Sequence, residues 1–151
     1  MEGLNPLGGR FQTRLSYVYN TTLDLKGTAP GDLAIYPVNH GKIELTAFGY
    51  EVMTATGAFT IASVLQLAII PYQNGTRVAP INAKAVLTAV ASQPIYSTVW
   101  TGLNLNEGVG PPAYPVAYRG DVLIFQLLTQ GTGTGAQDVR PWIHFRERPL
   151  T

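Results

Sequence analysis

The strongest constraint on the fold comes from residues 119–146, which predict two strands joined by a loop rich in glycine and threonine. Because successive residues of a strand point to opposite faces, the first strand, residues 121–128, is apolar on both sides. One face carries Val122, Ile124 and Leu128 around Gln126, and the other carries Leu123, Phe125 and Leu127. A strand with one face in water would alternate apolar and polar residues. We therefore expect the second face to meet another layer of the domain or another copy of the chain.

The composition indicates one folded domain with few surface charges. The chain has 151 residues, of which 46% are hydrophobic and only 13% are charged. That charged share is roughly half of the typical value of about 25%. Since the cores of protein interfaces are depleted in charge, this pattern is typical of an assembly subunit. A secreted or surface-exposed β-domain would have the same composition, so both interpretations stay open.

Charge and cysteine content argue against several classes of protein. The formal net charge is +1, and no basic run is present that could neutralise nucleic-acid phosphates. The absence of cysteine excludes disulfide scaffolds and thiolate zinc sites. Residues 1–10 have neither the basic start nor the apolar run of a signal peptide. The longest near-apolar run, residues 61–71, is too short to span a membrane, so we expect a chain made in a cytoplasm.

Short alternating segments separated by turns predict an all-β fold. Residues 1–15 read as an extended N-terminal arm, because glycine and proline interrupt scattered apolar residues. Residues 16–151 then predict a single domain of eight to ten short strands. In residues 42–54 we expect Ile43, Leu45 and Ala47 on one face and Phe48 on the other. The spacing is typical of a β-sandwich or barrel, and we favour a jelly-roll-like sandwich.

Three further segments have specific predictions. Residues 59–70 predict one long strand, and Asn74 with Gly75 predicts a tight hairpin turn after it. Residues 83–91 are ambiguous because Asn82 could cap a short helix, but their β-branched residues favour a strand. Residues 106–115, rich in glycine and proline, predict a long loop, where a functional or interface feature is expected.

No set of residues forms a recognisable catalytic or metal-binding pattern. The two histidines, His40 and His144, lack metal-ligand spacing, and no serine lies in a nucleophile-elbow motif. Asp121 and Asp138 flank the last hairpin and could approach each other, but strand-end turns use aspartate for structural reasons. Residues 119–121 spell Arg-Gly-Asp, an adhesion tripeptide that is also an ordinary turn entering a strand. We therefore expect no enzymatic activity, metal or cofactor.

Aromatic residues provide the remaining candidate site. Five of them could form a platform for a sugar or the centre of a protein interface: Tyr96, Trp100, Tyr114, Tyr118 and Trp142. The sequence does not separate these two uses.

The closing pattern carries a family resemblance. Gly120-Asp121-Val122-Leu123, then Gln130-Gly131-Thr132-Gly133, then residues 139–146 resemble the last hairpin of small β-sandwich structural proteins of tailed bacteriophages. Among these proteins, the chain looks most like a capsid decoration (cement) protein. Such proteins sit as trimers on the outside of the head, where they clamp neighbouring major capsid proteins after expansion. The resemblance implies no catalytic residues.

The resemblance and the strand pattern together give specific expectations. We expect a homotrimer on the capsid exterior of a virion, with the major capsid protein as its partner. The trimer interface is expected to use Ile124, Phe125, Leu127 and Trp142, and the capsid contact to use Leu4, Leu7, Phe11 and Arg14. The alternative function is a receptor- or carbohydrate-binding β-sandwich of a phage tail tip or fibre, which would depend on Trp100 or Trp142. A cupin or lyase is a third alternative, against which the shortage of histidines argues.

Overall fold

The computed structural model describes residues 14–18, 23–25, 30–39, 41–55, 57–133 and 138–148, with the backbone alone for residues 14–18 and 23–24. Within these ranges the protein forms twelve β-strands and no helix. The all-β prediction is therefore confirmed. Its jelly-roll connectivity stays a prediction.

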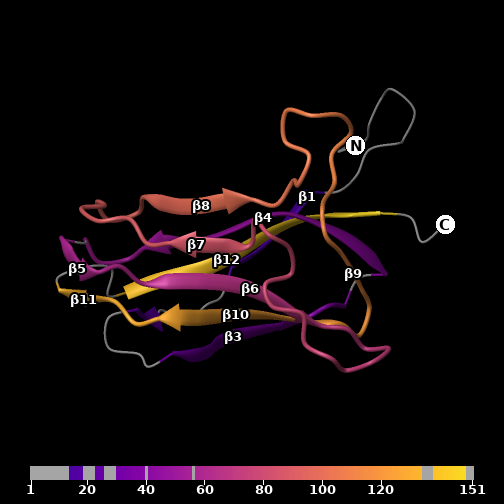
Figure 1. Ribbon diagram of the computed structural model, residues 1–151, viewed down its shortest axis with the longest axis horizontal. Coiled ribbons are helices and arrows are strands. Elements are labelled where there is room, and N and C mark those ends of the chain that lie inside the picture. The colour runs from indigo at the N-terminus through magenta and orange to yellow at the C-terminus, as the bar shows by residue number, and fades with distance from the viewer. Residues whose placement is uncertain are drawn as a thin grey trace, which may run out of the picture.

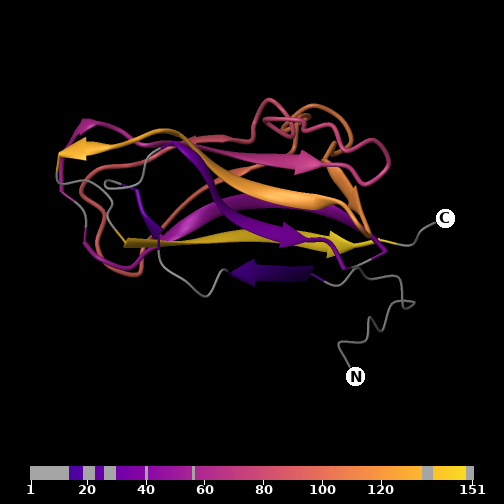
Figure 2. The same cartoon turned by 90° about the horizontal axis from the view of Figure 1, so that it is seen from below.

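Two antiparallel sheets pack face to face (Figures 1 and 2). Sheet A has the order β1 (Arg14–Val18), β12 (Asp138–Glu147), β4 (Lys42–Val52) and β8 (Thr98–Gly102), with β2 (Leu23–Asp24) pairing with β12 and β9 (Val116–Tyr118) pairing with β4. Sheet B has the order β3 (Gly31–Pro37), β10 (Val122–Thr129), β6 (Val64–Ile70) and β7 (Val86–Thr88). A short ribbon pairs β5 (Phe59–Ile61) with β11 (Thr132–Gly133). The result is a sandwich-like domain with a single core.

The core fills the space between the two sheets. Phe48 from β4 and Phe125 from β10 meet edge to face, with ring centroids 5.8 Å apart. Tyr36 from β3 and Phe145 from β12 stack with centroids 5.9 Å apart. Such aromatic pairs add about 0.5–1.5 kcal/mol beyond the burial of their area. These contacts link the outer strand of sheet B to the centre of sheet A.

The middle of strand β10, from Leu123 to Leu127, is buried on both faces. Leu123, Phe125 and Leu127 point into the core, as the alternation predicts. Ile124 lies on the outer face, yet only 1% of its surface is exposed. Leu128, which we expected beside Ile124, is exposed because the pairing register shifts between Leu127 and Thr129.

Strand β4 contains a bulge that changes the expected facing of its residues. In the pairing with β12, His144 lies opposite Ala47 and Phe145 opposite Leu45, which leaves Thr46 as the extra residue. Because one extra residue reverses the alternation, Phe48 enters the core and Ala47 faces outward. Ala47 therefore does not share a face with Leu45, and the expected facing of both Ala47 and Phe48 is wrong.

Smaller differences concern element boundaries. Residues 59–70 form two strands in different sheets, because the chain crosses over at the buried Ser63. The first residues of β1 are Arg14 and Leu15, which we had placed in the arm. The ambiguous segment 83–91 contains the strand β7, as we favoured. Gly75, with φ of 66°, lies in the connection that brings Val78 opposite Ile69, but Asn74 is not left-handed and the connection is longer than the tight turn that we predict.

Candidate functional site

The residues predicted for a trimer interface lie in two different places. Ile124, Phe125 and Leu127 are buried by the chain itself and present no surface to a second copy. A contact between copies therefore has to use residues other than these three. Trp142 lies on the outer face of sheet A, where 8% of its surface is exposed.

The residues predicted for capsid contact fall mostly outside the described part of the chain. Leu4, Leu7 and Phe11 lie there, as does His40. Arg14 begins β1, with its backbone opposite Arg146 of β12. The capsid contact of these residues therefore stays a prediction.

Two of the five predicted aromatic residues come together on sheet A. Trp142 of β12, Gly49 of β4 and Trp100 of β8 lie side by side in the strand register. Together with Ala47, Thr98 and His144, the two tryptophans line a shallow hollow of about 310 Å³, which we call the tryptophan groove. The other three aromatics lie elsewhere. Tyr114, for example, packs under the guanidinium of Arg146, 5.0 Å from its ring centre.

The bulge at Thr46 gives the groove its shape. It turns the two smallest residues of β4, Ala47 and Gly49, toward the outside, beneath the aromatic side chains. A Cβ at position 49 would lie 2.3 Å from the carbonyl oxygen of Val99 and 2.6 Å from the Cβ of Trp100. Only glycine therefore allows β8 to run this close to β4. The alternation in the sequence does not identify either small residue as part of a surface, because their facing depends on the bulge.

The groove is electrically neutral at neutral pH. His144 stacks on Trp142, with ring centroids 4.3 Å apart, and burial lowers the pKa of its imidazole. The nearest charged residues on β12 are paired with residues of β4. Arg146 lies 3.0 Å from Glu44, and Arg140 lies 3.9 Å from Glu51. The lining therefore combines apolar rings with uncharged hydrogen-bonding groups.

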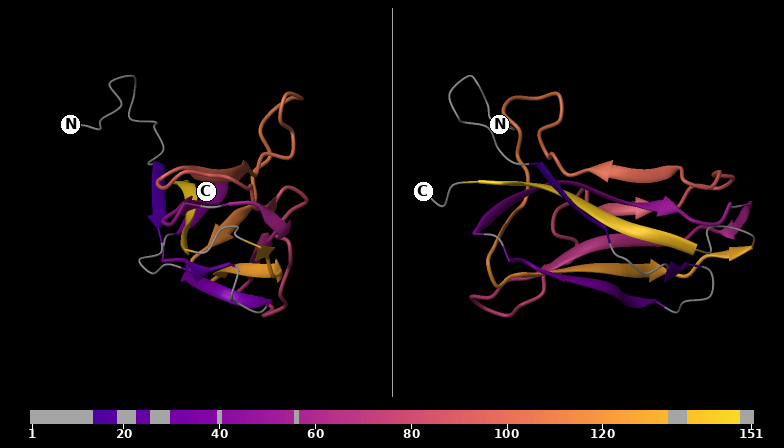
Figure 3. Two further views of the ribbon diagram at one scale, coloured as in Figure 1. Left: turned by 90° about the vertical axis from the view of Figure 1, so that its left-hand side faces the viewer. Right: turned by 180° about the vertical axis from the view of Figure 1, so that it is seen from behind.

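A second candidate feature is the loop of residues 104–115, which we call the Val109 loop. It connects β8 to β9 and projects past the β8 edge of the sandwich (Figure 3). The side-chain oxygen of Asn104 accepts hydrogen bonds from the backbone N–H groups of Asn106 (2.9 Å) and Ala113 (2.8 Å). The Asn106 amide in turn donates to the carbonyl of Pro111 at 3.0 Å. Asparagine side chains thus replace the strand pairing that the loop lacks.

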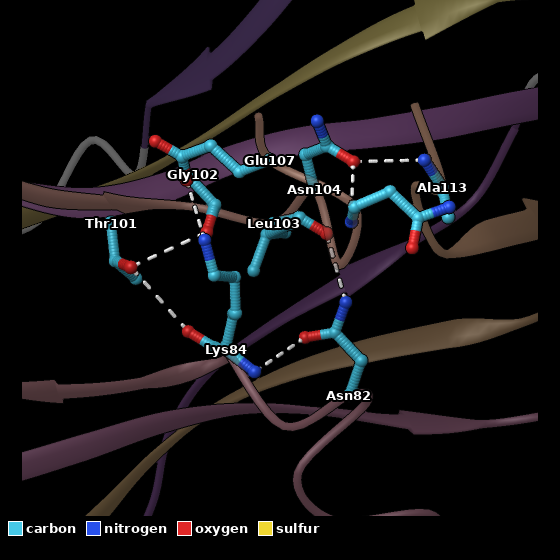
Figure 4. A network of polar contacts seen from close by, with 9 residues as sticks. Asn82, Lys84, Thr101, Gly102, Leu103, Asn104, Glu107 and Ala113 are labelled. Atoms are coloured by element: carbon cyan, nitrogen blue, oxygen red, sulfur yellow. Dashed lines mark hydrogen bonds and ion pairs between the residues drawn. The ribbon is translucent and has the colours of Figure 1, made fainter. Parts of the chain in front are cut away.

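The base of the loop is tied to the segment before β7 (Figure 4). Asn82 donates a hydrogen bond to the carbonyl of Leu103 at 2.9 Å, and Lys84 forms an ion pair with Glu107. This ammonium partner lowers the pKa of the Glu107 carboxyl. The position of the loop is therefore set by contacts on both of its sides.

The tip of this braced loop is apolar. Val109 lies between Gly108 and Gly110, whose φ angles of 76° and 72° belong to the left-handed region that glycine favours. Three-quarters of the Val109 surface is exposed (75%). A valine between two glycines in a proline-rich loop is the sequence signal that could have identified this tip.

The Arg-Gly-Asp tripeptide does not present an adhesion motif. Asp121 is buried, and its two carboxylate oxygens accept hydrogen bonds from the backbone N–H groups of Tyr72 (2.9 Å) and Tyr118 (2.8 Å). Asp138 instead accepts a hydrogen bond from Thr54 at 2.7 Å. The expected last hairpin is wrong, because β10 lies in sheet B and β12 in sheet A. The two strands begin at opposite ends of the sandwich (Figure 1), so the two aspartates do not form a pair. Both have the structural roles of strand-end residues.

Comparisons with protein-family models, curated proteins and solved structures give no match to this chain. Among the described residues, no three histidine, aspartate or glutamate side chains gather where they could hold a metal ion. The described part of the chain also contains no helix long and apolar enough to cross a membrane. The tryptophan groove and the Val109 loop are two candidate functional features, beside a larger hollow of about 530 Å³ that Tyr72, Tyr118 and Arg119 help to line.

Proposed function

We propose that this chain is a non-enzymatic structural protein of a tailed phage, a trimeric decoration protein that binds the outside of the capsid. The observation that supports the proposal is the Val109 loop. An apolar side chain that is exposed to water on an ordered loop tip is unfavourable in free energy. Binding of the tip in an apolar hollow of a partner removes that surface from water and is therefore favourable. Because the loop is already ordered, binding loses little conformational entropy.

The mechanism follows from mass action. A decoration protein that binds only the expanded shell stabilises that state by its binding free energy. At a free concentration of ~100 times Kd, each occupied site contributes about 2.7 kcal/mol. A trimer would engage several sites at once, so that modest contacts add through effective concentration. Residues Leu4, Leu7, Phe11 and Arg14 are proposed to add a second contact to the shell.

The first test is the mass of the purified protein in solution. A trimer at micromolar concentration is expected, and a stable monomer would contradict the trimeric assembly. The second test adds the protein to undecorated expanded heads and follows their melting temperature, which we expect to rise. No change in melting temperature would overturn the proposed function.

Variants of the loop and of the N-terminal arm test the two proposed contacts with the capsid separately. Val109→Asp places a charge at the loop tip, and we expect it to weaken binding to heads at least about tenfold without changing the fold. Val90→Asp is the matched control, because Val90 is also exposed but follows β7 and lies outside the Val109 loop. Deletion of residues 1–13 leaves β1 intact and separately tests the arm. Equal binding of Val109→Asp and the unmodified protein would exclude the loop from the contact.

A further inference from the structure

The tryptophan groove is open to ligands in a way that the core-facing aromatic residues are not. Trp100 has 59% of its surface exposed, and it faces Trp142 across the position of Gly49. We propose that this groove binds a neutral sugar, with one pyranose ring stacked on the indole of Trp100. This proposal is separate from capsid attachment through the Val109 loop, because the groove and the loop share no residues.

The shape and size of the groove fit a sugar ring. One face of a pyranose presents C–H groups whose positive polarisation matches the negative face of an indole. A flat ring can therefore cover Trp100 while its edge rests above Ala47, the floor of the groove. The volume of about 310 Å³ lies at the lower limit of the range of roughly 300–1,000 Å³ for ligand pockets. One or two sugar rings would fill it.

The polar groups of the groove match the edge of a sugar. The Thr98 hydroxyl and the His144 imidazole line the groove together with the two indole rings. Within the part of the chain that the structure describes, neither of these two groups makes a hydrogen bond. A hydroxyl and a neutral imidazole each donate and accept, as sugar hydroxyl groups do. The groove can thus recognise both the apolar face and the polar rim of one ring.

Charge selects the class of sugar. No lining residue carries a formal charge while His144 is neutral, and the flanking Arg146 and Arg140 lie 3.0 Å and 3.9 Å from Glu44 and Glu51. A carboxylate or phosphate on the ligand would lose its hydration without gaining a cationic partner among the residues that line the groove. Neutral hexoses and N-acetylated amino sugars therefore fit the groove better than sialic acid or sugar phosphates.

The experiment uses a built-in probe, because the two tryptophans of the chain both line the groove. Intrinsic tryptophan fluorescence of the full chain is titrated with glucose, galactose, mannose, N-acetylglucosamine, lactose and cellobiose. We expect a saturable change for at least one of them, with a Kd on the order of millimolar. Sialic acid is titrated in parallel and is expected to bind at least tenfold more weakly.

Variants locate the binding to the groove. Trp100→Ala removes the stacking surface while Trp142 still reports, and Ala47→Leu fills the floor without removing an aromatic ring. Both should abolish the saturable change, whereas Tyr96→Ala, which removes an exposed ring outside the groove, should retain it. Circular dichroism and thermal melting confirm that each variant is folded.

The proposal is overturned if no neutral sugar gives a saturable change, if sialic acid binds as tightly as the neutral sugars, or if the response survives in both groove variants. Titration calorimetry of the unmodified protein provides a readout that does not depend on fluorescence. Binding of Trp100→Ala to expanded heads should be unchanged, which separates a failure of this proposal from a failure of the capsid proposal.

Discussion

The outer faces of the two sheets differ in how the chain treats large apolar residues. On sheet B, Ile124 lies at an outward position and is nevertheless buried. On sheet A, Trp100 also lies at an outward position but is more than half exposed. Both residues would be read from sequence as interface candidates. Their exposure differs because the neighbouring strands place different side chains beside Ile124 and Trp100.

A polar network covers the part of the outer face of sheet B around Gln126, whereas Ile35 and Val86 on the same face stay exposed. Arg77, from the segment after β6, forms two hydrogen bonds of 2.9 Å with Asp32 of β3. Because β10 lies between β3 and β6, this pair bridges over β10. Gln126 donates to Asp32 at 2.8 Å and accepts from Gln66 at 2.7 Å. The aliphatic stems of such side chains cover apolar neighbours while their polar ends remain partly in water.

Sheet A has no equivalent cover over the tryptophan groove among the described residues. Its long charged residues pair along β12 and β4 on either side of the groove, and Ala47 and Gly49 are too short to fill the space between the tryptophans. An apolar outward residue is therefore evidence of a binding surface only after its own neighbours have been considered. By this criterion the groove, and not β10, is the candidate surface of the sandwich.

The largest effect is expected in the core. Phe125→Ala should lower the free energy of unfolding by about 3–5 kcal/mol, because the ring is fully buried and its loss leaves a cavity beside Phe48. Urea denaturation measures the change. A loss below about 1 kcal/mol would show that this face of β10 is not the core face.

The next effect tests whether the outer face of β10 is sealed. Ile124→Ala should cost about 2 kcal/mol or more, since its side chain is almost fully buried although it lies outside the main core. Its neighbour in the register, Ile35, is mostly exposed, so Ile35→Ala should change stability by less than about 0.5 kcal/mol. Ile124→Ala should also leave the mass in solution unchanged. If Ile124→Ala instead dissociated the assembly and left the stability of the monomer unchanged, Ile124 would be an interface residue.

A smaller effect should come from the polar cover itself. Arg77→Met removes an ion pair whose two side chains are more than one-third exposed, so only a small loss of stability is expected at neutral pH. Hydrogen bonds from Arg77 and Gln126 lower the pKa of Asp32 below its ordinary value of 3.8. The contribution of the charged Asp32 is therefore complete above pH 3.8 and is lost as pH falls through the lowered pKa. The difference between Arg77→Met and the unmodified protein should shrink in acid, and a constant difference would contradict this role.

The smallest effect concerns the groove. Burial lowers the pKa of His144 below its ordinary value of 6.5, so the unfolded chain binds this proton more readily than the folded chain. The stability contribution is complete above pH 6.5 and is lost as pH falls through the lowered pKa. In His144→Gln the slope of unfolding free energy against pH between about 5 and 7 should become flatter. Thermal melting across this range measures it, and an unchanged slope would place His144 in a water-like environment.

Local patterns predicted most of the strands and some of their facing. In β12 the alternation correctly assigns Ile143 and Phe145 to the core and His144 to the outside. Asn74 and Gly75 predict that the chain turns after β6, where Gly75 is left-handed, but not the length of the connection. The groove was only partly predictable. Trp100 and Trp142 were named as candidates, but their proximity depends on a third strand between them.

What the sequence by itself determined is the all-β class, the period-two alternation within strands and the identity of the aromatic residues available for binding. These follow from interactions between residues that are close along the chain. Tertiary structure alone decided that Thr46 is a bulge, that Arg77 reaches Asp32 across 45 residues, and that Ile124 is covered. Each of these outcomes depends on the pairing and packing of distant strands, whose positions no local pattern encodes.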